Sequence, residues 1–437
     1  MKGRVAVKRK PWFFHLGVAG FLAFALLAAS SAVGASGTGN PGAGGRHWVN
    51  TWTAMPQLTE PGNMPPAPFT RDGLVLADAT LRQTVRVTVG GDDLRLRFSN
   101  AFGGAPLPLT AVSVALPRDG RAGTAAVEPG SVRPVTFHGA PSTVVPVGAQ
   151  VVSDPLPFTV RSGANLTVTT YLAEGQASND ITSHPGSRTT SHLLAGEHVA
   201  AGDLPGATPT DHWYFLSGVE VRASRATAAA VVVGDSLTDG RGSTTNGNDR
   251  WPDQLFDRLN AGPGTARTAI LNQAAGGNRV LNDGLGPNLL ARLDRDVLAQ
   301  SGVEWLIVFH GVNDIGTAAA TPEAQAAAKA QLLAAYDQVV TRAHAAGIRV
   351  YGATLPPFGG NDMYDDAAGL REATRQAVNT WVRESGTFDA VVDFDRAVRD
   401  PADPGRLLPA ADTGDHLHLT PYGYGLLADA VPARLLR

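Results

Sequence analysis

The 437-residue sequence contains no cysteine. This absence excludes disulfide bonds, a cysteine nucleophile and thiolate metal sites. The sequence also has no internal repeat with the period of a solenoid or a propeller, and no long low-complexity tract beyond residue 46. A chain of this length can bury enough apolar surface to fold without covalent cross-links, and its length indicates two domains.

The N-terminus has the order of a secretory signal peptide. Basic residues at five of the first ten positions precede an apolar run over residues 12–29, and small residues follow. A membrane-spanning helix is the alternative, but the run contains a histidine and two glycines and leads directly into a glycine-rich segment. We therefore expect a signal peptide at residues 1–35, a linker at residues 36–46, and a secreted protein without stable membrane insertion after cleavage.

The charge balance of the expected mature chain is negative. Loss of residues 1–35 removes five of the 36 basic residues and none of the 39 acidic residues, which leaves a formal net charge of −8. Such a protein is poorly suited to binding polyanions, so we expect no nucleic-acid partner. The function must therefore be sought in the local motifs.

Residues 47–223 have the pattern of an antiparallel all-β domain. Short runs of alternating apolar and polar residues are separated by Gly, Pro, Asp and Asn, and no helical stripe interrupts them. The predicted strands cover residues 84–89, 94–98, 111–116, 156–160 and 165–172. The first two flank the turn at residues 90–93, which predicts a hairpin, and the whole pattern predicts a β-sandwich.

Residues 226–437 instead alternate strands with helices. Five short apolar runs suit strands that are buried on both faces, at residues 230–233, 269–271, 305–309, 350–353 and 390–394. Helical segments are expected at residues 322–346 and 366–384, and Thr420 with Pro421 has the pattern of a helix start. Successive βα units predict a doubly wound, flavodoxin-like parallel sheet whose active site lies at the carboxyl ends of the strands.

Four motifs follow these strands or precede the last helix. The tetrapeptide GDSL at residues 234–237 could by itself be only a helix cap. Three further motifs accompany it, NQAAGGN at 272–278, GVND at 311–314 and DHLH at 415–418. In their order and strand context these motifs resemble the four blocks of the SGNH/GDSL hydrolase family, over roughly residues 226–437.

The resemblance implies a catalytic serine and its helpers. Ser236 is the implied nucleophile, and His418 is the implied base, oriented by Asp415 three residues earlier. A serine hydroxyl needs a neutral imidazole to take its proton, and a carboxylate on the other ring nitrogen fixes the tautomer. The implied donors to the oxyanion are the backbone N–H groups of Ser236 and Gly277 and the Asn313 amide. One departure from the family pattern is alanine at position 274, where glycine is frequent.

Several other residues are candidates with a structural alternative. His416 also neighbours Asp415 and competes with His418 for the role of base. Asn278 and His310 are possible substrate contacts, although His310 can equally be a packed neutral histidine. The loop at residues 240–248, rich in turn formers, is expected beside Ser236 and in reach of substrate. The acidic loop at residues 361–366 can bind calcium or simply be solvated.

These observations predict a serine carboxylesterase that works through an acyl-enzyme on Ser236 without metal or organic cofactor. Short-chain esters or O-acetylated sugars and polysaccharides are the favoured substrates. The alternatives are an extracellular lipase for longer acyl chains, or a glycan-binding protein with a degenerate hydrolase domain. A row of exposed Trp or Tyr on one face of residues 47–223 would favour glycan binding, whereas burial of Trp48, Trp52 and Trp213 would favour a structural domain.

Overall fold

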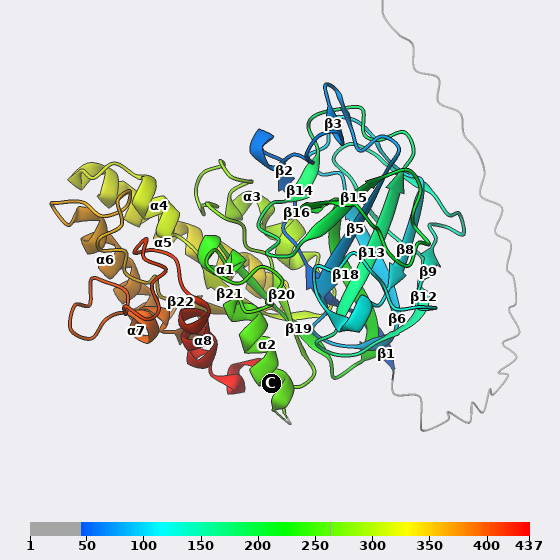
Figure 1. Cartoon of the computed structure of the whole chain (residues 1–437). Coiled ribbons are helices and arrows are strands. Elements are labelled where there is room, and N and C mark those ends of the chain that lie inside the picture. The colour runs from blue at the N-terminus through cyan, green and yellow to red at the C-terminus, as the bar shows by residue number, and fades with distance from the viewer. Residues whose placement is uncertain (1–44, 263) are drawn as a thin grey trace, which may run out of the picture. The chain divides into compact units, whose positions relative to one another are not determined.

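The computed structural model describes residues 45–262 and 264–437 (Figure 1). The predicted signal peptide and residues 36–44 of the predicted linker lie outside the described residues. Within the described ranges, no helix combines the length and the apolar character needed to cross a bilayer.

The first part of the described chain contains antiparallel sheets, which confirms the predicted all-β region (Figure 1). One large sheet has the order β1-β18-β6-β11 with β12 also on β6, and the other has the order β16-β15-β5-β13-β8-β9. The strands of the first are β1 Arg46–Thr53, β18 Leu216–Ser224, β6 Gly91–Ser99, β11 Gln150–Val152 and β12 Leu156–Val160. The strands of the second are β16 Thr208–Thr210, β15 Ser191–Ala195, β5 Ala79–Arg86, β13 Asn165–Leu172, β8 Ala111–Ala115 and β9 Arg133–Val135.

Three smaller sheets complete this region. They are β17-β14-β2, β10-β7 and β3-β4. Their strands are β17 Trp213–Tyr214, β14 Thr182–His184, β2 Gln57–Leu58, β10 Thr143–Val145, β7 Leu107–Leu109, β3 Thr70–Arg71 and β4 Leu74–Val75. The sheet that contains β14 is the one that reaches the functional site described below.

The predicted hairpin around residues 90–93 is wrong. Strand β5 pairs with β13 and β15, whereas β6 pairs with β18, β11 and β12, so the two strands belong to different sheets. The backbone between them is held by distant partners. Thr51 Oγ1 donates to the Val89 carbonyl at 2.6 Å, and the Gly90 N–H donates to Ser162 Oγ at 3.0 Å. The turn therefore carries the chain from one sheet to the other.

The tryptophans of the all-β region have structural roles. Trp52 and Trp213 are buried and pack edge to face with their ring centroids 4.9 Å apart. The Trp213 indole also donates to the Thr84 carbonyl at 3.0 Å. Trp48 is half-buried beneath the Arg95 guanidinium, 4.4 Å from its ring centroid. No tryptophan or tyrosine of residues 47–223 is exposed, so this region offers no row of exposed Trp or Tyr rings for a glycan.

The second part contains the predicted doubly wound parallel sheet. Its strand order is β20-β19-β21-β22-β23, and every neighbouring pair is parallel. The strands are β19 Ala228–Gly234, β20 Thr268–Asn272, β21 Val303–Phe309, β22 Arg349–Ala353 and β23 Ala390–Val392. Strand β20 lies on one side of β19, and β21 lies on the other side. The order of the strands therefore reverses at β19, and a crevice is expected at the carboxyl ends of β19 and β21.

Helices connect these strands (Figure 1). They are α1 Ser236–Asp239, α2 Trp251–Ala261, α3 Leu289–Leu293 with a π-helical continuation Asp294–Leu298, α4 Val312–Thr317, α5 Pro322–Ala345, α6 Leu370–Glu384, α7 Phe394–Val398 and α8 Pro421–Ala430. The helix predicted from residue 366 begins at Leu370, because the Asp366 carboxylate accepts the N–H groups of Leu370 and Arg371 and so ends the preceding loop. Thr420 caps α8 as predicted.

The two parts share hydrogen bonds along strand β1. The Asn50 N–H donates to the Ser301 carbonyl at 3.0 Å, and the Ser301 N–H donates back to Asn50 Oδ1 at 2.7 Å. Nearby, Thr53 Oγ1 donates to the Asn272 carbonyl at 3.3 Å. The all-β region therefore bonds directly to the last residue of β20 and to the segment that precedes β21.

Candidate active site

The turn after β19 places Ser236 at the mouth of the crevice. Asp235 caps helix α1 by accepting the Leu237 N–H at 3.1 Å, and Ser236 is the first residue of the helix. Gly234 permits this turn, because a Cβ there would lie 2.7 Å from the Phe309 carbonyl oxygen on β21. The local sequence thus aims the Ser236 side chain outward from the sheet edge with a helix N-terminus behind it.

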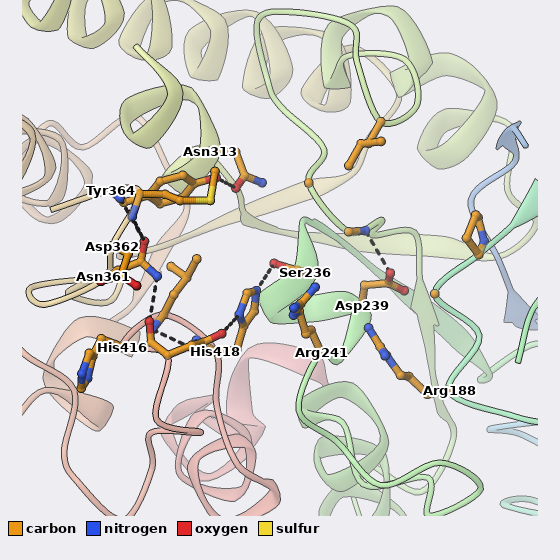
Figure 2. A pocket seen from close by; sticks show the side chains of 18 of the residues that line it. Arg188, Ser236, Asp239, Arg241, Asn313, Asn361, Asp362, Tyr364, His416 and His418 are labelled. Atoms are coloured by element: carbon orange, nitrogen blue, oxygen red, sulfur yellow. Dashed lines mark hydrogen bonds and ion pairs between the residues drawn. The ribbon is translucent and has the colours of Figure 1, made fainter. Parts of the chain in front are cut away.

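The structure brings Ser236, His418 and Asp415 together, and Figure 2 shows the contact between Ser236 and His418. Ser236 Oγ lies 2.8 Å from His418 Nε2, and His418 Nδ1 lies 2.6 Å from Asp415 Oδ2. The other carboxylate oxygen, Asp415 Oδ1, accepts the backbone N–H groups of His418 and Leu417 at 2.8 and 3.1 Å. Asp415 is therefore fixed against the segment that it orients.

The charge states of this pair suit proton transfer. Burial pushes the pKa of Asp415 upward, but hydrogen bonds from the His418 ring and backbone outweigh it and hold this pKa well below its usual range. Burial lowers the pKa of His418, and the positive charges of Arg241 and Arg188 lower it further, against the opposing effect of Asp415. His418 is therefore a neutral imidazole at neutral pH, and Asp415 accepts its Nδ1–H.

His416 has a different partner. Its Nδ1 lies 2.6 Å from Asp412 Oδ2, and its backbone has a φ of 60°. In Figure 2 its ring lies apart from the contact between Ser236 and His418. Of the two histidines near Asp415, only His418 is placed between the carboxylate and the serine.

Two backbone donors are available beside Ser236. Among the described residues, neither the Ser236 N–H nor the Gly277 N–H donates to a protein acceptor. Gly277 has a φ of +70°, and a Cβ there would lie 2.4 Å from Leu285 Cδ1. Glycine therefore keeps this backbone accessible to a small group in the cavity.

The Asn313 amide is held by two neighbours. Its Nδ2 donates to the Asn278 carbonyl at 2.8 Å, and its Oδ1 accepts the Tyr364 hydroxyl at 2.7 Å. An amide nitrogen carries two hydrogens, so one N–H remains for the cavity that Asn313 lines. Tyr364 could not be predicted as a partner of Asn313, because it lies on a loop 51 residues away in sequence.

Asn278 and His310 do not line the cavity, which corrects the expectation that they contact substrate. The Asn278 side chain is fully buried and donates to the carbonyls of Leu285 and Pro287. His310 is also buried, and burial lowers its pKa to about 3. The Asn278 side chain therefore supports the loop that follows Gly277, and His310 is a packed neutral histidine.

Two buried carboxyl groups lie behind the site. Asp314 accepts the backbone N–H groups of Val280 and Leu281, each at 2.9 Å, and thereby fixes the loop that follows Gly277. Burial raises the pKa of Asp314 to about 6, and burial likewise raises the pKa of Asp235 to about 7. These groups order the turns that carry Gly277 and Ser236.

The Ser236 hydroxyl opens into a cavity of about 950 Å³. Loops of the α/β part supply most of the cavity wall, and the all-β region supplies the rest. The contribution of the all-β region was not predicted from the sequence. The contribution from the all-β region is Gln57, Glu60, Asn63, Pro185, Gly186, Arg188 and His212. Gly186 lies close against helix α1, since a Cβ there would be 1.8 Å from Asp239 Oδ2.

The acidic loop at residues 361–366 forms part of the same wall. Asn361 Nδ2 donates to the Asp415 carbonyl at 2.7 Å, and Asn361 Oδ1 accepts the N–H groups of Met363 and Tyr364. Within residues 45–262 and 264–437, no group of three or more acidic, histidine or cysteine side chains is placed to hold a metal ion. The loop thus connects the Asp415 segment to Tyr364.

Comparison with known families agrees with this geometry. Residues 232–426 match the sequence profile of the GDSL-like Lipase/Acylhydrolase family. These residues form a GDSL-like hydrolase domain. The matched segment contains Ser236, Asp415 and His418, and the parallel sheet described above is the sheet of this GDSL domain.

Solved structures with some similarity to the chain include a lipase and an esterase. A GDSL-like lipase from Bacteroides thetaiotaomicron has 16% identity and a TM-score of 0.35, covering 46% of this chain and 84% of its own. An acetylxylan esterase from Geobacillus stearothermophilus has 19% identity and a TM-score of 0.35, covering 47% of this chain and 94% of its own. None of the curated proteins compared matches the chain.

Proposed function

We propose that this protein is a secreted serine carboxylesterase that hydrolyses short-chain or O-acetyl esters. The observation that supports this most strongly is the continuous hydrogen-bonded path from Ser236 Oγ through His418 to Asp415, in a cavity that exposes the serine. Membership of residues 232–426 in an acylhydrolase family agrees with ester hydrolysis.

The proposed reaction has two stages. Ser236 Oγ attacks the ester carbonyl carbon while His418 Nε2 takes the hydroxyl proton, and the same nitrogen then protonates the departing alcohol oxygen. Water attacks the resulting acyl-enzyme with His418 again acting as base, which releases the acid and restores Ser236. The negative charge that develops on the carbonyl oxygen in each stage would be stabilised by the Ser236 and Gly277 N–H groups and the remaining Asn313 N–H.

The cavity lining favours small or polar esters. Its apolar side chains, apart from the ring of Tyr364, are Pro185, Leu285, Met363 and Leu417. A long acyl chain would need a continuous apolar groove, because its binding depends on the apolar surface removed from water. An acetyl group with a polar alcohol, such as a sugar, needs only a small apolar contact and many hydrogen-bonding groups.

The experiment is a panel of 4-nitrophenyl esters of increasing chain length, together with acetylated xylan and pectin, tested on wild-type protein and Ser236→Ala. We expect activity to be highest on acetyl and other short esters, and the variant to lose roughly 10⁶ in kcat while it keeps the wild-type circular dichroism spectrum. Wild-type turnover by folded Ser236→Ala would reject the mechanism. A maximum at long acyl chains would instead support the lipase alternative.

A further inference from the structure

Two arginines in the cavity have no ionic partner. Arg188 comes from the loop between β14 and β15, and Arg241 follows helix α1. Among the described residues, neither guanidinium makes an ion pair or donates to any acceptor, and Arg188 Nε is buried without a partner. A buried cationic donor without an acceptor is unusual, because its desolvation is uncompensated.

The backbone holds both arginines in defined places. Arg241 lies between Gly240 and Gly242, which have φ values of 97° and 95°, while its N–H donates to the Ser236 carbonyl at 3.0 Å and its carbonyl accepts the Tyr424 hydroxyl at 2.6 Å. Arg188 has a φ of 50°, a conformation that glycine or asparagine adopts more readily. Side chains kept in such a conformation beside a cavity are frequently functional.

The cavity carboxylates near these arginines are already engaged. Glu60 accepts from Gln57 and Asn63, Asp239 accepts from His184 and a backbone N–H, and Asp415 holds His418. Among the described residues, none of the carboxylates that line the cavity, Glu60, Asp239, Asp362 and Asp415, forms an ion pair with either guanidinium. Both guanidinium groups therefore keep N–H donors that can bind an acid group of a ligand.

The arginines lie on the His418 side of the serine. Their charges lower the pKa of His418, whereas the pKa of Tyr364, beside the Asn313 amide, responds to Arg279 and Arg371. In Figure 2 Arg241 and Arg188 lie across Ser236 from Asn313 and Tyr364. Because His418 protonates the departing alcohol, the alcohol portion of the substrate is the portion that would reach them.

We infer that Arg188 and Arg241 form a subsite for a carboxylate on the alcohol portion of the ester, so that the preferred substrates are acyl esters of hydroxy acids, including acetylated sugar acids. This inference rests on the proposed esterase function. The planar guanidinium can bind a carboxylate through two parallel hydrogen bonds. The negative net charge of the chain disfavours long polyanions in general, but two unpaired arginines in a cavity can still select a single acid group.

The test compares 4-acetoxybenzoate, whose alcohol portion carries a carboxylate, with its neutral methyl ester. We expect wild-type protein to prefer the charged substrate, and the charged-to-neutral ratio of kcat/KM to fall roughly tenfold in Arg241→Gln and further in Arg188→Gln/Arg241→Gln. Comparing ratios between variants cancels the difference in leaving-group reactivity. Arg161→Gln, an exposed arginine that does not line the cavity, is the control with the same change in net charge.

Several results separate the inference from the esterase function on which it rests. An unchanged ratio in Arg241→Gln, with hydrolysis still dependent on Ser236, would overturn the subsite alone. The subsite would also be overturned if the enzyme preferred charged substrates only when the acid group is on the acyl portion, as in mono-4-nitrophenyl succinate. Hydrolysis by folded Ser236→Ala would overturn the esterase function instead. Calorimetric titration of Ser236→Ala with 4-hydroxybenzoate gives a readout without turnover, and binding should weaken when Arg241→Gln is added.

Discussion

His184 Nε2 lies 2.9 Å from Asp239 Oδ1, and this contact joins the all-β region to the helix that begins with the catalytic serine candidate. His184 Nδ1 faces the Met55 carbonyl at 3.1 Å, so it must carry a hydrogen to donate there. A further proton must then lie between Nε2 and Oδ1. The second oxygen, Asp239 Oδ2, accepts the Gly276 N–H at 2.9 Å, next to the Gly277 donor. Through Asp239, His184 of the all-β region thus helps to position the backbone at Gly276 and Gly277.

Removal of His184 should cost both stability and turnover. The side chains of His184 and Asp239 are only 5% and 3% exposed, so His184→Ala leaves a buried carboxylate with one donor fewer. We expect the free energy of unfolding to fall by about 3–5 kcal/mol in chemical denaturation. We also expect kcat to fall more than KM rises, because the Gly276 segment loses its anchor. His138→Asn, at an exposed histidine with a φ of 52°, should change neither quantity.

The two histidines near Asp415 should differ sharply on substitution. His418→Ala removes the proposed base and should lower kcat by roughly 10⁶. His416→Asn keeps a residue that tolerates the φ of 60° and should retain activity within about threefold of wild type, since His416 bonds to Asp412. Steady-state kinetics on 4-nitrophenyl acetate would decide, and the opposite ranking would show that His416 is the base.

The Asn313 amide and the hydroxyl that holds it should have graded effects. Asn313→Ala should lower kcat by about 10²–10³ with little change in KM, as expected for a donor used mainly in the transition state. Tyr364→Phe removes the hydrogen bond to Asn313 Oδ1 but leaves the amide, so a loss of about tenfold in kcat is expected. If Asn313→Ala had wild-type kcat, the oxyanion would be stabilised by the two backbone N–H groups alone.

The pH dependence of kcat/KM should report His418. The base works only when it is neutral, so activity falls as the pH decreases through its pKa. Because burial and the two arginines lower the pKa of His418, the acid-side midpoint should lie below the ordinary histidine value of about 6.5. Arg241→Gln removes one positive charge, which raises the pKa of His418 and moves the midpoint to higher pH. Arg161→Gln should leave the midpoint in place.

Motifs close to strand ends were predictable from the sequence, because each contains its own local signal. The three-residue spacing of Asp415 and His418 and the placement of Ser236 after a buried strand needed no knowledge of distant contacts. The hairpin at residues 90–93 failed because Val89 and Gly90 take their hydrogen bonds from segments far away in sequence. No local pattern distinguishes a turn within a sheet from a turn between sheets.

Residues that reach the site from elsewhere in the chain gave no such signal. Arg188 and His184 belong to strands and loops about 50 residues before Ser236, and their importance comes from tertiary contacts alone. The role of Gly186 could not be predicted from the sequence either. Its lack of a side chain allows the β14–β15 loop to approach Asp239. The grouping of Ser236, Asp415 and His418 could therefore be predicted from local motifs, whereas the part of the cavity wall that comes from the all-β region could not.

The shared wall of the cavity has an evolutionary consequence. Seven of the 24 residues that line it come from the all-β region, and none of these seven is Ser236, Asp415 or His418. If the proposed esterase function and arginine subsite hold, insertions, deletions or exchanges in the β14–β15 loop would change which alcohols are accepted and leave Ser236, Asp415 and His418 unaltered. Selection can act on recognition and on reactivity through separate stretches of the same gene.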